Sequence, residues 1–490
     1  MTDWRSLTPT FRFPTGLLID GRWEQASGSL DVISPIDGAL LGTVASADTS
    51  DVDRAVGAAR RAFDDGRWSG KAPAERKEIL LRWAHLCEAN RDHLALAHAL
   101  EMGKPAREAH AVDMRAVIRT LQWFGEAIDK IVDEMPHVAP DALAMVQREP
   151  AGVVGAVVPW NFPLTMAAWK LAPALVTGCT VVLKPAEQSP ISALLLAELG
   201  LEAGLPDGVL NVVNGPGHIT GQALGRHPDV DVLTFTGSTE VGRKFMEYSA
   251  SSNLKRVWLE LGGKGANVVF PDADLDKAAH TAAWSIFYNA GQMCSAGSRL
   301  LVHESVHDEV VRTVLEVASS MQPGNPLDHD VPLGSVVTHE HRDRIHSMVL
   351  SGLRESGEAL TGGSPVLVDT GGAYYPPTVI DSVAPTTLLA QQELFGPVLA
   401  VTTFRTEEEA LALANGTPYG LASAVWTTDL NRAHRFARSM KFGVVWVNCY
   451  EEGDLTVPFG GVKLSGFGRD KSLHALDKFY DIKTTWIDLT

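Results

Sequence analysis

The sequence predicts an α/β protein that contains two parallel, doubly wound sheets in separate domains. Short apolar segments alternate with helical patterns from about residue 150 onward, and the same alternation resumes after residue 257. Strands and helices that alternate in this way build βαβ units. A single hydrophobic core seldom accommodates a chain of 490 residues, so we expect two or three domains.

The composition is that of a globular protein, and it excludes several classes of function. Hydrophobic residues make up 45% of the chain and charged residues 21%, which is typical of a soluble protein. The formal net charge of −17 argues against a nucleic-acid partner, because phosphate binding needs clustered Lys and Arg. The 4 cysteines show neither Cys-x-x-Cys nor zinc-site spacing, so we expect no metal site and a reducing compartment.

Neither a signal peptide nor a membrane span is expected. Residues 1–21 contain several charged side chains and two prolines, unlike a secretory leader. The most apolar stretch, residues 166–183, is interrupted by Lys170, Pro173 and Gly178, and it is too short to cross a bilayer. We therefore expect a cytoplasmic protein without a membrane partner.

The N-terminal part predicts a hairpin followed by a layer of helices. Residues 16–23 have the pattern of a hairpin, with Asp20-Gly21 as its turn. Ser50 is the expected N-cap of the next helix, and Asp53 approximates the acidic residue of a capping box. Further helical patterns cover residues 74–89, 92–100 and 112–132.

The following segment predicts four strands whose carboxyl ends carry polar residues, where ligands bind in such sheets. The strands are expected at residues 152–158, 180–184, 209–213 and 232–235. The first strand ends at Trp160-Asn161, and the second at Lys184 and Glu187. The fourth ends at a turn from Gly237 to Gly242, where a helix begins.

These strand ends favour a dinucleotide site. The N–H groups of the Gly237-Ser238-Thr239 turn suit a phosphate, and Glu187 suits ribose hydroxyls. Each feature taken singly is also explained by an exposed turn, and the Gly-x-Gly-x-x-Gly fingerprint is absent. Their occurrence at several strand ends nevertheless favours a dinucleotide.

The second region contains two candidate reactive residues. Glu260 lies between an apolar strand and two glycines, which is an unusual place for a solvated charge. Cys294 follows a helical pattern at residues 273–289 and is flanked by small residues. A lone cysteine is more often a buried core residue than a nucleophile. Beyond it, residues 459–468 predict a glycine-rich loop and residues 479–489 a terminal strand.

Seven short motifs follow one another along nearly the whole chain. They are Pro159-Trp-Asn-Phe-Pro163, Lys184-Pro-Ala-Glu187, Phe235-Thr-Gly-Ser-Thr239, Leu259-Glu-Leu-Gly-Gly-Lys264, Gly291-Gln-Met-Cys294, Glu393-Leu-Phe-Gly-Pro397, and Pro458-Phe-Gly-Gly461 with Ser465-Gly466. In order and spacing the set resembles the aldehyde dehydrogenase superfamily, closest to the bacterial branch that oxidises γ-glutamyl-γ-aminobutyraldehyde and other ω-aminoaldehydes.

The resemblance implies a fold with three parts. A Rossmann-type NAD-binding domain would comprise residues 1–127 and 151–260, and an α/β catalytic domain residues 261–460. A small β arm for oligomerisation or bridging would comprise residues 128–150 and 470–490. A homo-oligomer, dimer or tetramer, is therefore expected.

The resemblance also implies the catalytic roles. Cys294 would attack the aldehyde carbon, and Glu260 would act as the base for the thiol or, later, for water. The Asn161 side-chain amide and the Cys294 backbone N–H would form the oxyanion hole. Because relatives that transfer the acyl group to coenzyme A tend to lack this glutamate, Glu260 favours a free carboxylic acid as product.

The implied cofactor is NAD, with NADP possible. A carboxylate at Glu187 would repel a 2′-phosphate, which favours NAD. The candidate cofactor-binding residues are Trp160, Lys184, Glu187, Gly217, Gly237, Ser238, Thr239, Gly242, Glu393 and Phe395.

The substrate class rests on similarity to the aminoaldehyde branch and on acidic residues near the C-terminus. Glu451 and Asp454 could place negative charge where a cationic substrate enters, although a solvated acidic turn explains them equally well. The candidate substrate-tunnel residues are Met166, Trp169, Met293, Glu451, Asp454 and Phe459, and core packing is the alternative for the apolar ones.

Three alternatives remain open. The first is a broad aliphatic or aromatic aldehyde dehydrogenase, and the second is a cysteine hydrolase that uses Cys294 with a histidine. No histidine lies within the matched motifs, which disfavours the hydrolase. The third, a binding protein that kept the fold, is disfavoured because Cys294, Glu260 and Asn161 are all present.

Overall fold

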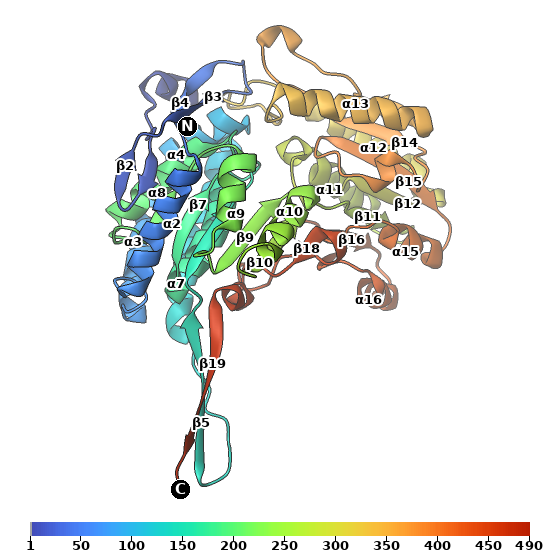
Figure 1. Cartoon of the computed structure of the whole chain (residues 1–490). Helices are drawn as coiled ribbons and strands as arrows, with labels where there is room; N and C mark the ends of the chain where they lie inside the picture. Colours follow the sequence, from blue (N-terminus) through green and yellow to red (C-terminus); the bar gives the residue numbers. More distant parts are fainter. Residues whose placement is uncertain (1) are drawn as a thin grey trace.

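The computed structural model describes residues 2–490, and it contains two large sheets and a two-stranded ribbon that projects away from them (Figure 1). The first sheet has the strand order β18-β10-β9-β6-β7-β8-β1-β2, and the second has the order β13-β14-β15-β12-β11-β16-β17. The chain passes from β10 (Arg256–Leu261) in the first sheet directly to β11 (Ala266–Val269) in the second. Glu260 therefore lies at the crossing between the two sheets.

The first sheet confirms the four predicted strands and the predicted hairpin. Its parallel strands are β6 (Val153–Val157), β7 (Thr180–Lys184), β8 (Leu210–Val212), β9 (Val232–Gly237) and β10. The hairpin β1 (Leu17–Ile19) and β2 (Arg22–Glu24) adds to one edge, and β18 (Gly466–Phe467) adds to the other. In β18, Gly466 pairs with Glu260, so the C-terminal segment returns to the strand that carries the candidate base.

Two helical layers cover this sheet because alternate side chains of β6 point to opposite faces. Val153 and Val157 join the core with α2 (Thr49–Asp64), α9 (Gln222–Arg226) and α10 (Thr239–Ala250). Val154 and Ala156 join a larger core on the other face. The helices of that layer are α3 (Pro73–Ala89), α4 (Arg91–Met102), α6 (Met114–Ala127), α7 (Pro163–Thr177) and α8 (Pro190–Glu202).

The predicted cap of α2 is wrong. The helix begins at Thr49, so Ser50 already lies in its first turn, and Asp48 is the N-cap. The Asp48 side chain accepts hydrogen bonds from the N–H groups of Ser50 and Asp51, and the Asp51 carboxylate accepts from the Asp48 N–H in return. Asp48 caps the helix because its extended backbone directs the carboxylate toward N–H groups that have no partner within the helix.

One other helix boundary also differs from the predictions, and the N-terminus of another helix is capped by a distant residue. The helix expected over residues 112–132 is shorter, because a π-helical segment occupies Ala109–Asp113 and α6 ends at Ala127. At the start of α8, Ser189 makes no capping bond with its side chain. The buried Glu101 carboxylate accepts from the Ile191 and Ser192 N–H groups instead, a contact between distant segments that no local pattern reveals.

The second sheet is also mostly parallel and is covered by helices. Its remaining strands are β12 (Arg299–His303), β13 (Glu358–Thr361), β14 (Thr378–Asp381), β15 (Val398–Phe404), β16 (Ala422–Trp426) and β17 (Val444–Val447). Its helices include α11 (Leu275–Phe287), α12 (His307–Ser320), α13 (His339–Glu355), α15 (Glu407–Asn415) and α16 (Leu430–Ser439). The sequence patterns did not indicate α13 or α16. The short helices are α1 (Trp4–Leu7), α5 (Ala106–Glu108) and α14 (Leu388–Gln391).

The projecting ribbon is formed by β5 (Ala142–Pro150) and the terminal strand β19 (Tyr480–Asp488), which pair antiparallel from end to end (Figure 1). A separate hairpin, β3 (Gly28–Ile33) with β4 (Leu40–Ser46), lies near the first sheet (Figure 1). Among residues 2–490, no helix combines the length and the apolar character that a bilayer crossing requires.

Candidate active site

A cavity of about 400 Å³ brings together the three predicted catalytic residues. Asn161, Glu260 and Cys294 all line it, although they come from three separate segments of the chain. Six of the other predicted residues also line it: Trp160, Met166, Gly237, Ser238, Glu393 and Phe395. The ends of strands β6, β9 and β10 thus face the Cys294 loop of the other sheet across one cavity.

The backbone that presents Cys294 is tightly constrained. After α11, Asn289, Ala290 and Gly291 all have positive φ values, of 52°, 52° and 70°. A Cβ atom at position 291 would lie 2.1 Å from the carbonyl oxygen of Gly396, and one at Gly263 would lie 2.4 Å from the carbonyl oxygen of Cys294. Because only glycine fits at both positions, the Cys294 loop can lie directly against the neighbouring loops.

The Cys294 thiol is surrounded by carboxyl groups. Burial raises its pKa well above the usual value, and the charges of Glu451, Glu393 and Glu260 raise it further. The free protein therefore holds a protonated thiol at neutral pH, and a nucleophilic role for Cys294 requires a base.

Glu260 has the properties of such a base. It is buried, and neither of its carboxyl oxygens has a hydrogen-bond partner among residues 2–490. Burial, and then the charge of Asp470, raise its pKa well above the usual glutamate value, although Lys170, Lys478 and Arg469 oppose the shift. A Cβ atom at Gly460 would lie 2.7 Å from the Glu260 Oε1 atom, so the glycine leaves room for this carboxyl group.

A buried ion cluster lies next to Glu260. The Lys170 Nζ atom lies 2.5 Å from the Asp470 Oδ2 atom, and Lys478 pairs with the Asp470 Oδ1 atom. All three side chains are almost completely buried. The two ammonium groups explain why the pKa of Asp470 is lowered in spite of its burial.

Asn161 is held by two hydrogen bonds. Its Nδ2 atom donates to the Gln292 carbonyl oxygen at 2.9 Å, and the Asn289 Nδ2 atom donates to the Asn161 carbonyl oxygen at 3.3 Å. The first bond uses one of the two amide N–H groups, so the other is left for a ligand.

The part of the cavity where the sequence predicts the cofactor contains another buried carboxyl group, Glu393. The Glu393 Oε1 atom accepts a hydrogen bond from the Gly263 N–H at 2.9 Å, and burial raises the Glu393 pKa to about 7. A Cβ atom at Gly262 would lie 2.0 Å from the Glu393 Oε2 atom, so a side chain at that position would displace the carboxylate.

Phe395 has a strained backbone, with a φ of 57°. His341, which the sequence did not indicate, donates from its Nε2 atom to the Phe395 carbonyl oxygen at 2.7 Å. The Trp160 ring contacts the Phe395 ring edge to face, with centroids 5.3 Å apart. Burial lowers the His341 pKa to about 4, so the imidazole is neutral at pH 7 and holds Phe395 without adding charge.

The predicted ribose-binding group is assembled beside this cavity. The Glu187 carboxylate accepts from the Lys184 ammonium at 3.3 Å and from the Gly217 N–H at 2.5 Å. Burial opposes ionisation of Glu187, but Lys184 and the N–H groups outweigh it, so its pKa is lowered. Glu187 lines a hollow of about 290 Å³ that shares Gln188, Val337, Thr338 and Glu340 with the main cavity.

The turn before α10 is divided between a ligand-facing part and a packing part. Gly237 and Ser238 line the cavity, and the Ser238 Oγ atom accepts from the Val241 N–H as an N-cap. Thr239 donates to the Leu464 carbonyl oxygen, and a Cβ atom at Gly242 would lie 2.8 Å from Leu261. Taken together, the helix N-terminus, the anionic Glu187 and the space above Gly262 fit an extended dinucleotide.

Only one of the predicted tunnel residues lines the cavity. Met166 lines the cavity, whereas Met293 packs into the core of the second sheet. The Trp169 and Phe459 rings contact each other with centroids 5.6 Å apart. Glu451 is half-buried, and Asp454 is exposed and accepts from the Thr456 N–H.

Several cavity residues were missed by the sequence patterns. They are Gln188, Glu340, His341 and Arg344. Three of them lie in the first turns of α13, a helix from the second domain that no motif marked. Polar residues on an amphipathic helix carry no local signal that distinguishes a ligand-facing position from a solvated one.

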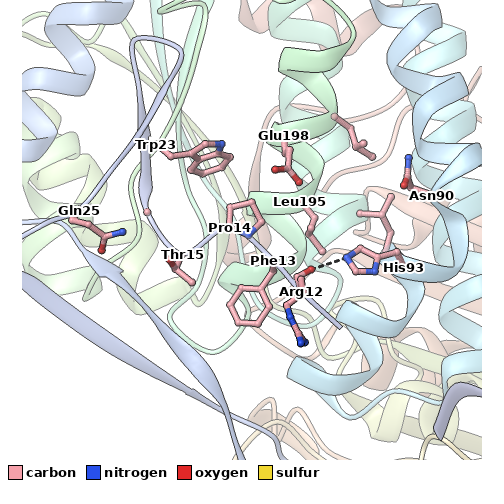
Figure 2. Close-up of a pocket in the computed structure, with 13 residues that line it drawn as sticks. Arg12, Phe13, Pro14, Thr15, Trp23, Gln25, Asn90, His93, Leu195 and Glu198 are labelled. Atoms are coloured by element: carbon pink, nitrogen blue, oxygen red, sulfur yellow. Dashed lines mark hydrogen bonds between the residues drawn. The ribbon is translucent and has the colours of Figure 1, made fainter. Parts of the chain in front are cut away.

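A larger hollow, of about 670 Å³, lies between the N-terminal segment and helices α4 and α8 (Figure 2). Its polar groups include Arg12, Glu198 and His93, which donates to the Arg12 carbonyl oxygen at 2.8 Å. None of the predicted site residues lines this hollow. Size alone therefore does not mark the reactive site.

Comparisons with known proteins agree with this geometry. The family model "Aldehyde dehydrogenase family" matches residues 23–485. The "NADP/NAD-dependent aldehyde dehydrogenase PuuC" of Escherichia coli (strain K12) is 47% identical over 489 residues, which cover 99% of this chain and 98% of that protein.

Two solved structures share the whole fold. The gamma-glutamyl-gamma-aminobutyraldehyde dehydrogenase of Burkholderia cenocepacia J2315 is 49% identical with a TM-score of 0.98, covering 100% of this chain and 99% of its own. A mutant indole-3-acetaldehyde dehydrogenase of P. syringae, in complex with NAD+, is 50% identical with a TM-score of 0.98, covering 99% of each chain.

Proposed function

The chain belongs to the aldehyde dehydrogenase family, and we propose that Cys294, Glu260 and Asn161 carry out its NAD-dependent reaction on aldehydes with a γ-glutamylamino or ω-amino end. The observation that carries this assignment is a single cavity lined by three groups. They are the protonated Cys294 thiol, the buried Glu260 carboxyl group without a partner among residues 2–490, and the Asn161 amide fixed by a hydrogen bond.

The first step forms a bond to Cys294. Glu260 takes the thiol proton, and the sulfur attacks the carbonyl carbon of the aldehyde to give a thiohemiacetal. The carbonyl electron pair moves onto the oxygen, which the Asn161 amide and the Cys294 backbone N–H stabilise. Losing one such donor typically costs about 2.7–4 kcal/mol of transition-state stabilisation.

The second half of the reaction releases the acid. When bound, NAD accepts the hydride that leaves the former aldehyde carbon. The acyl group then remains on Cys294 as a thioester. After Glu260 has released the thiol proton to solvent, it removes a proton from water, and the water oxygen attacks the thioester carbon. The carbon–sulfur bond breaks to give the carboxylic acid, and the departing Cys294 thiolate takes the proton back from Glu260.

The cofactor would extend from the hollow beside Glu187 into the main cavity and be held in both. Glu187 would accept hydrogen bonds from the adenosine ribose, and the Ser238 turn would border the pyrophosphate. Glu393 would hold the nicotinamide ribose with Phe395 beside the ring. Because Lys184 and Gly217 keep Glu187 anionic, a 2′-phosphate would be repelled, which supports NAD over NADP.

The aminoaldehyde class is supported by the gamma-glutamyl-gamma-aminobutyraldehyde dehydrogenase relative and by the carboxylates around Cys294. Such a substrate would place this enzyme in polyamine breakdown. The second candidate, a broad or aromatic specificity, is supported by the indole-3-acetaldehyde dehydrogenase relative. A panel of kcat/KM values for γ-glutamylaminobutyraldehyde, 4-aminobutyraldehyde, indole-3-acetaldehyde and hexanal separates the two. A clear preference for hexanal or the indole compound would reject the aminoaldehyde assignment.

The division into an NAD-binding domain (1–127 and 151–260), a catalytic domain (261–460) and bridging segments (128–150 and 470–490) remains part of this proposal. The ribbon supports a homo-oligomer, because Ile482, Trp486 and Ile487 expose large apolar surface on it. A cytoplasmic location is supported by the unpaired state of all 4 cysteines.

Substitution of the nucleophile tests the catalytic assignment. Cys294→Ala should abolish the absorbance of reduced nicotinamide that forms when aldehyde and NAD are mixed with the protein. Cys449→Ala is a matched control, because this half-buried thiol packs against the same cluster of residues without lining the cavity. Dehydrogenase activity in the Cys294→Ala variant would contradict the assignment. A cysteine hydrolase would instead cleave esters and leave aldehyde and NAD unchanged.

A further inference from the structure

Two half-buried charges of opposite sign lie on neighbouring loops beside the Cys294 site. Glu451 lies on the loop that follows β17, and Lys471 lies just before the C-terminal ribbon. Backbone hydrogen bonds tie the loops together: Phe459 and Asp470 exchange two, and the Ser472 N–H donates to the Leu455 carbonyl oxygen. The two charges are therefore held in a fixed relation to each other.

Both loops are next to the aldehyde side of Cys294. The hydroxyl of Tyr450, the residue before Glu451, donates to the carbonyl oxygen of Ser295, the residue after Cys294. The Lys471 Nζ atom lies over the Trp169 ring, 5.8 Å from its centroid. Trp169 is one helical turn beyond the cavity residue Met166 on α7, so it lies on the same helix face.

Glu451 and Lys471 form no ion pair with each other, and one oxygen of Glu451 has no partner in the described part of the chain. The Glu451 Oε1 atom is buried and accepts no hydrogen bond, and within residues 2–490 Lys471 forms no ion pair within 4.0 Å. Burial raises the pKa of Glu451, whereas a hydrogen bond with the Ser295 side chain and the charge of Lys471 lower it. Partly desolvated charges that remain unpaired are unfavourable, and a ligand that pairs with both removes that cost.

The backbone at both charges is also strained. Glu451, Lys471 and Ser472 have φ values of 57°, 61° and 50°, in the left-handed region that non-glycine residues seldom adopt. Such strain occurs preferentially at ligand-binding sites, where it fixes side chains in positions that relaxed backbone would not give.

We propose that Glu451 and Lys471 form a subsite for the zwitterionic end of a γ-glutamylamino aldehyde. Glu451 binds the α-ammonium group and Lys471 binds the α-carboxylate, while Trp169 and Phe459 contact the chain between that end and Cys294. The assignment rests on the proposed aldehyde dehydrogenase function and refines its substrate class. An aldehyde with only an amino group would pair with Glu451 and leave Lys471 unpaired.

Four aldehydes with the same amide-linked chain test the subsite. The acyl part of N-acyl-4-aminobutyraldehyde is γ-glutamyl (both charges), 4-aminobutyryl (ammonium only), glutaryl (carboxylate only) or pentanoyl (neutral). Lys471→Met should lower kcat/KM about 10- to 100-fold for the two aldehydes that have the carboxylate. Glu451→Gln should lower it by a similar factor for the two that have the ammonium. In each variant the aldehydes that lack the matching charge should change far less.

Glu452→Gln is the matched control, because Glu452 neighbours Glu451 but is exposed. Equal losses for all four aldehydes would show that the loops only support the fold, and they would overturn the proposal. An increase in kcat/KM for the 4-aminobutyryl aldehyde in Lys471→Met, without a loss for the glutaryl aldehyde, would also overturn it, because Lys471 would then compete with cations. If the unmodified protein oxidised neither these four aldehydes nor hexanal, the proposed function itself would be wrong.

Discussion

The two sides of Cys294, which we propose bind the cofactor and the aldehyde, differ in how their charged groups are satisfied. On the cofactor side, Glu187 accepts bonds from Lys184 and Gly217, and Glu393 accepts one from Gly263. On the aldehyde side, both oxygens of Glu260 and one oxygen of Glu451 are buried without a partner. The cofactor side is thus complete in the free protein, whereas the aldehyde side keeps polar groups available for reaction.

The difference has a physical basis. A cofactor that binds in the same way at every turnover is best served by groups that are already oriented. A catalytic base must exchange protons, so a carboxyl group that is locked in hydrogen bonds would be a poor one. The cost of burying unpartnered carboxyl groups is what raises their pKa values.

The strongest test of this comparison is Glu260→Gln. We expect kcat to fall by about 10²- to 10⁴-fold, because general base catalysis is lost. NAD affinity, measured by quenching of tryptophan fluorescence, should stay unchanged, since Glu260 belongs to the aldehyde side. Glu316→Gln on the exposed face of α12 is the control. A matching loss of NAD affinity would show that the two sides are not independent.

Next in size is the effect of Asp470→Asn on stability. Removing this carboxylate leaves the ammonium groups of Lys170 and Lys478 buried without a counter-charge. Breaking a buried pair typically lowers the free energy of unfolding by about 3–5 kcal/mol. Urea denaturation measures the change, and Asp477→Asn, at an exposed position in the 3₁₀-helical segment that contains Lys478, should have little effect. Equal stability of the two variants would contradict the role of the cluster.

A smaller change is expected for Glu187→Gln, which affects only the cofactor side. Loss of the carboxylate removes its repulsion of a 2′-phosphate, which is about 1 kcal/mol for unit charges about 4 Å apart in water. The ratio of kcat/KM for NADP to that for NAD should rise roughly fivefold. The KM for the aldehyde should not change, and a change would contradict the separation of the two sides.

The smallest effect is a shift in the pH profile. Glu260 must be ionised to act as a base, so kcat should rise with pH through its raised pKa. The positive charge of Arg469 favours the ionised form. Arg469→Gln removes that charge, so Glu260 keeps its proton up to a higher pH. The acid limb of the kcat profile should therefore shift to higher pH. Movement to lower pH would contradict this account.

Local sequence patterns led more directly to the residues proposed for the cofactor side than to those proposed for the aldehyde side. Lys184 ends a strand, Glu187 and Ser238 lie just after strands, and a parallel sheet brings the ends of its strands together. Local patterns were therefore sufficient to propose these residues. The prediction that Cys294, Asn161 and Glu260 belong to one site came from the family resemblance, because no local pattern connects those segments. The structure brings all three into one cavity.

What the patterns missed depends on contacts between distant residues. Lys170 and Asp470 are 300 positions apart, and Glu101 caps a helix 90 positions away. His341 was missed because its role depends on the strained backbone of Phe395, which the sequence does not reveal. The wrong prediction of Ser50 as an N-cap has a local cause. Several residues that can cap a helix lie within a few positions of one another, and only the backbone conformation selects Asp48.

The ribbon of β5 and β19 also constrains the order of events during synthesis. Lys483 pairs with Glu149, which precedes it by 334 positions. At a typical elongation rate, β5 therefore waits roughly 15–70 s for its partner strand. Asp470 and β18, which complete the surroundings of Glu260, also follow it by more than about 200 positions. A nascent chain can thus form strands β6 to β10 of the first sheet before the surroundings of Glu260 are complete.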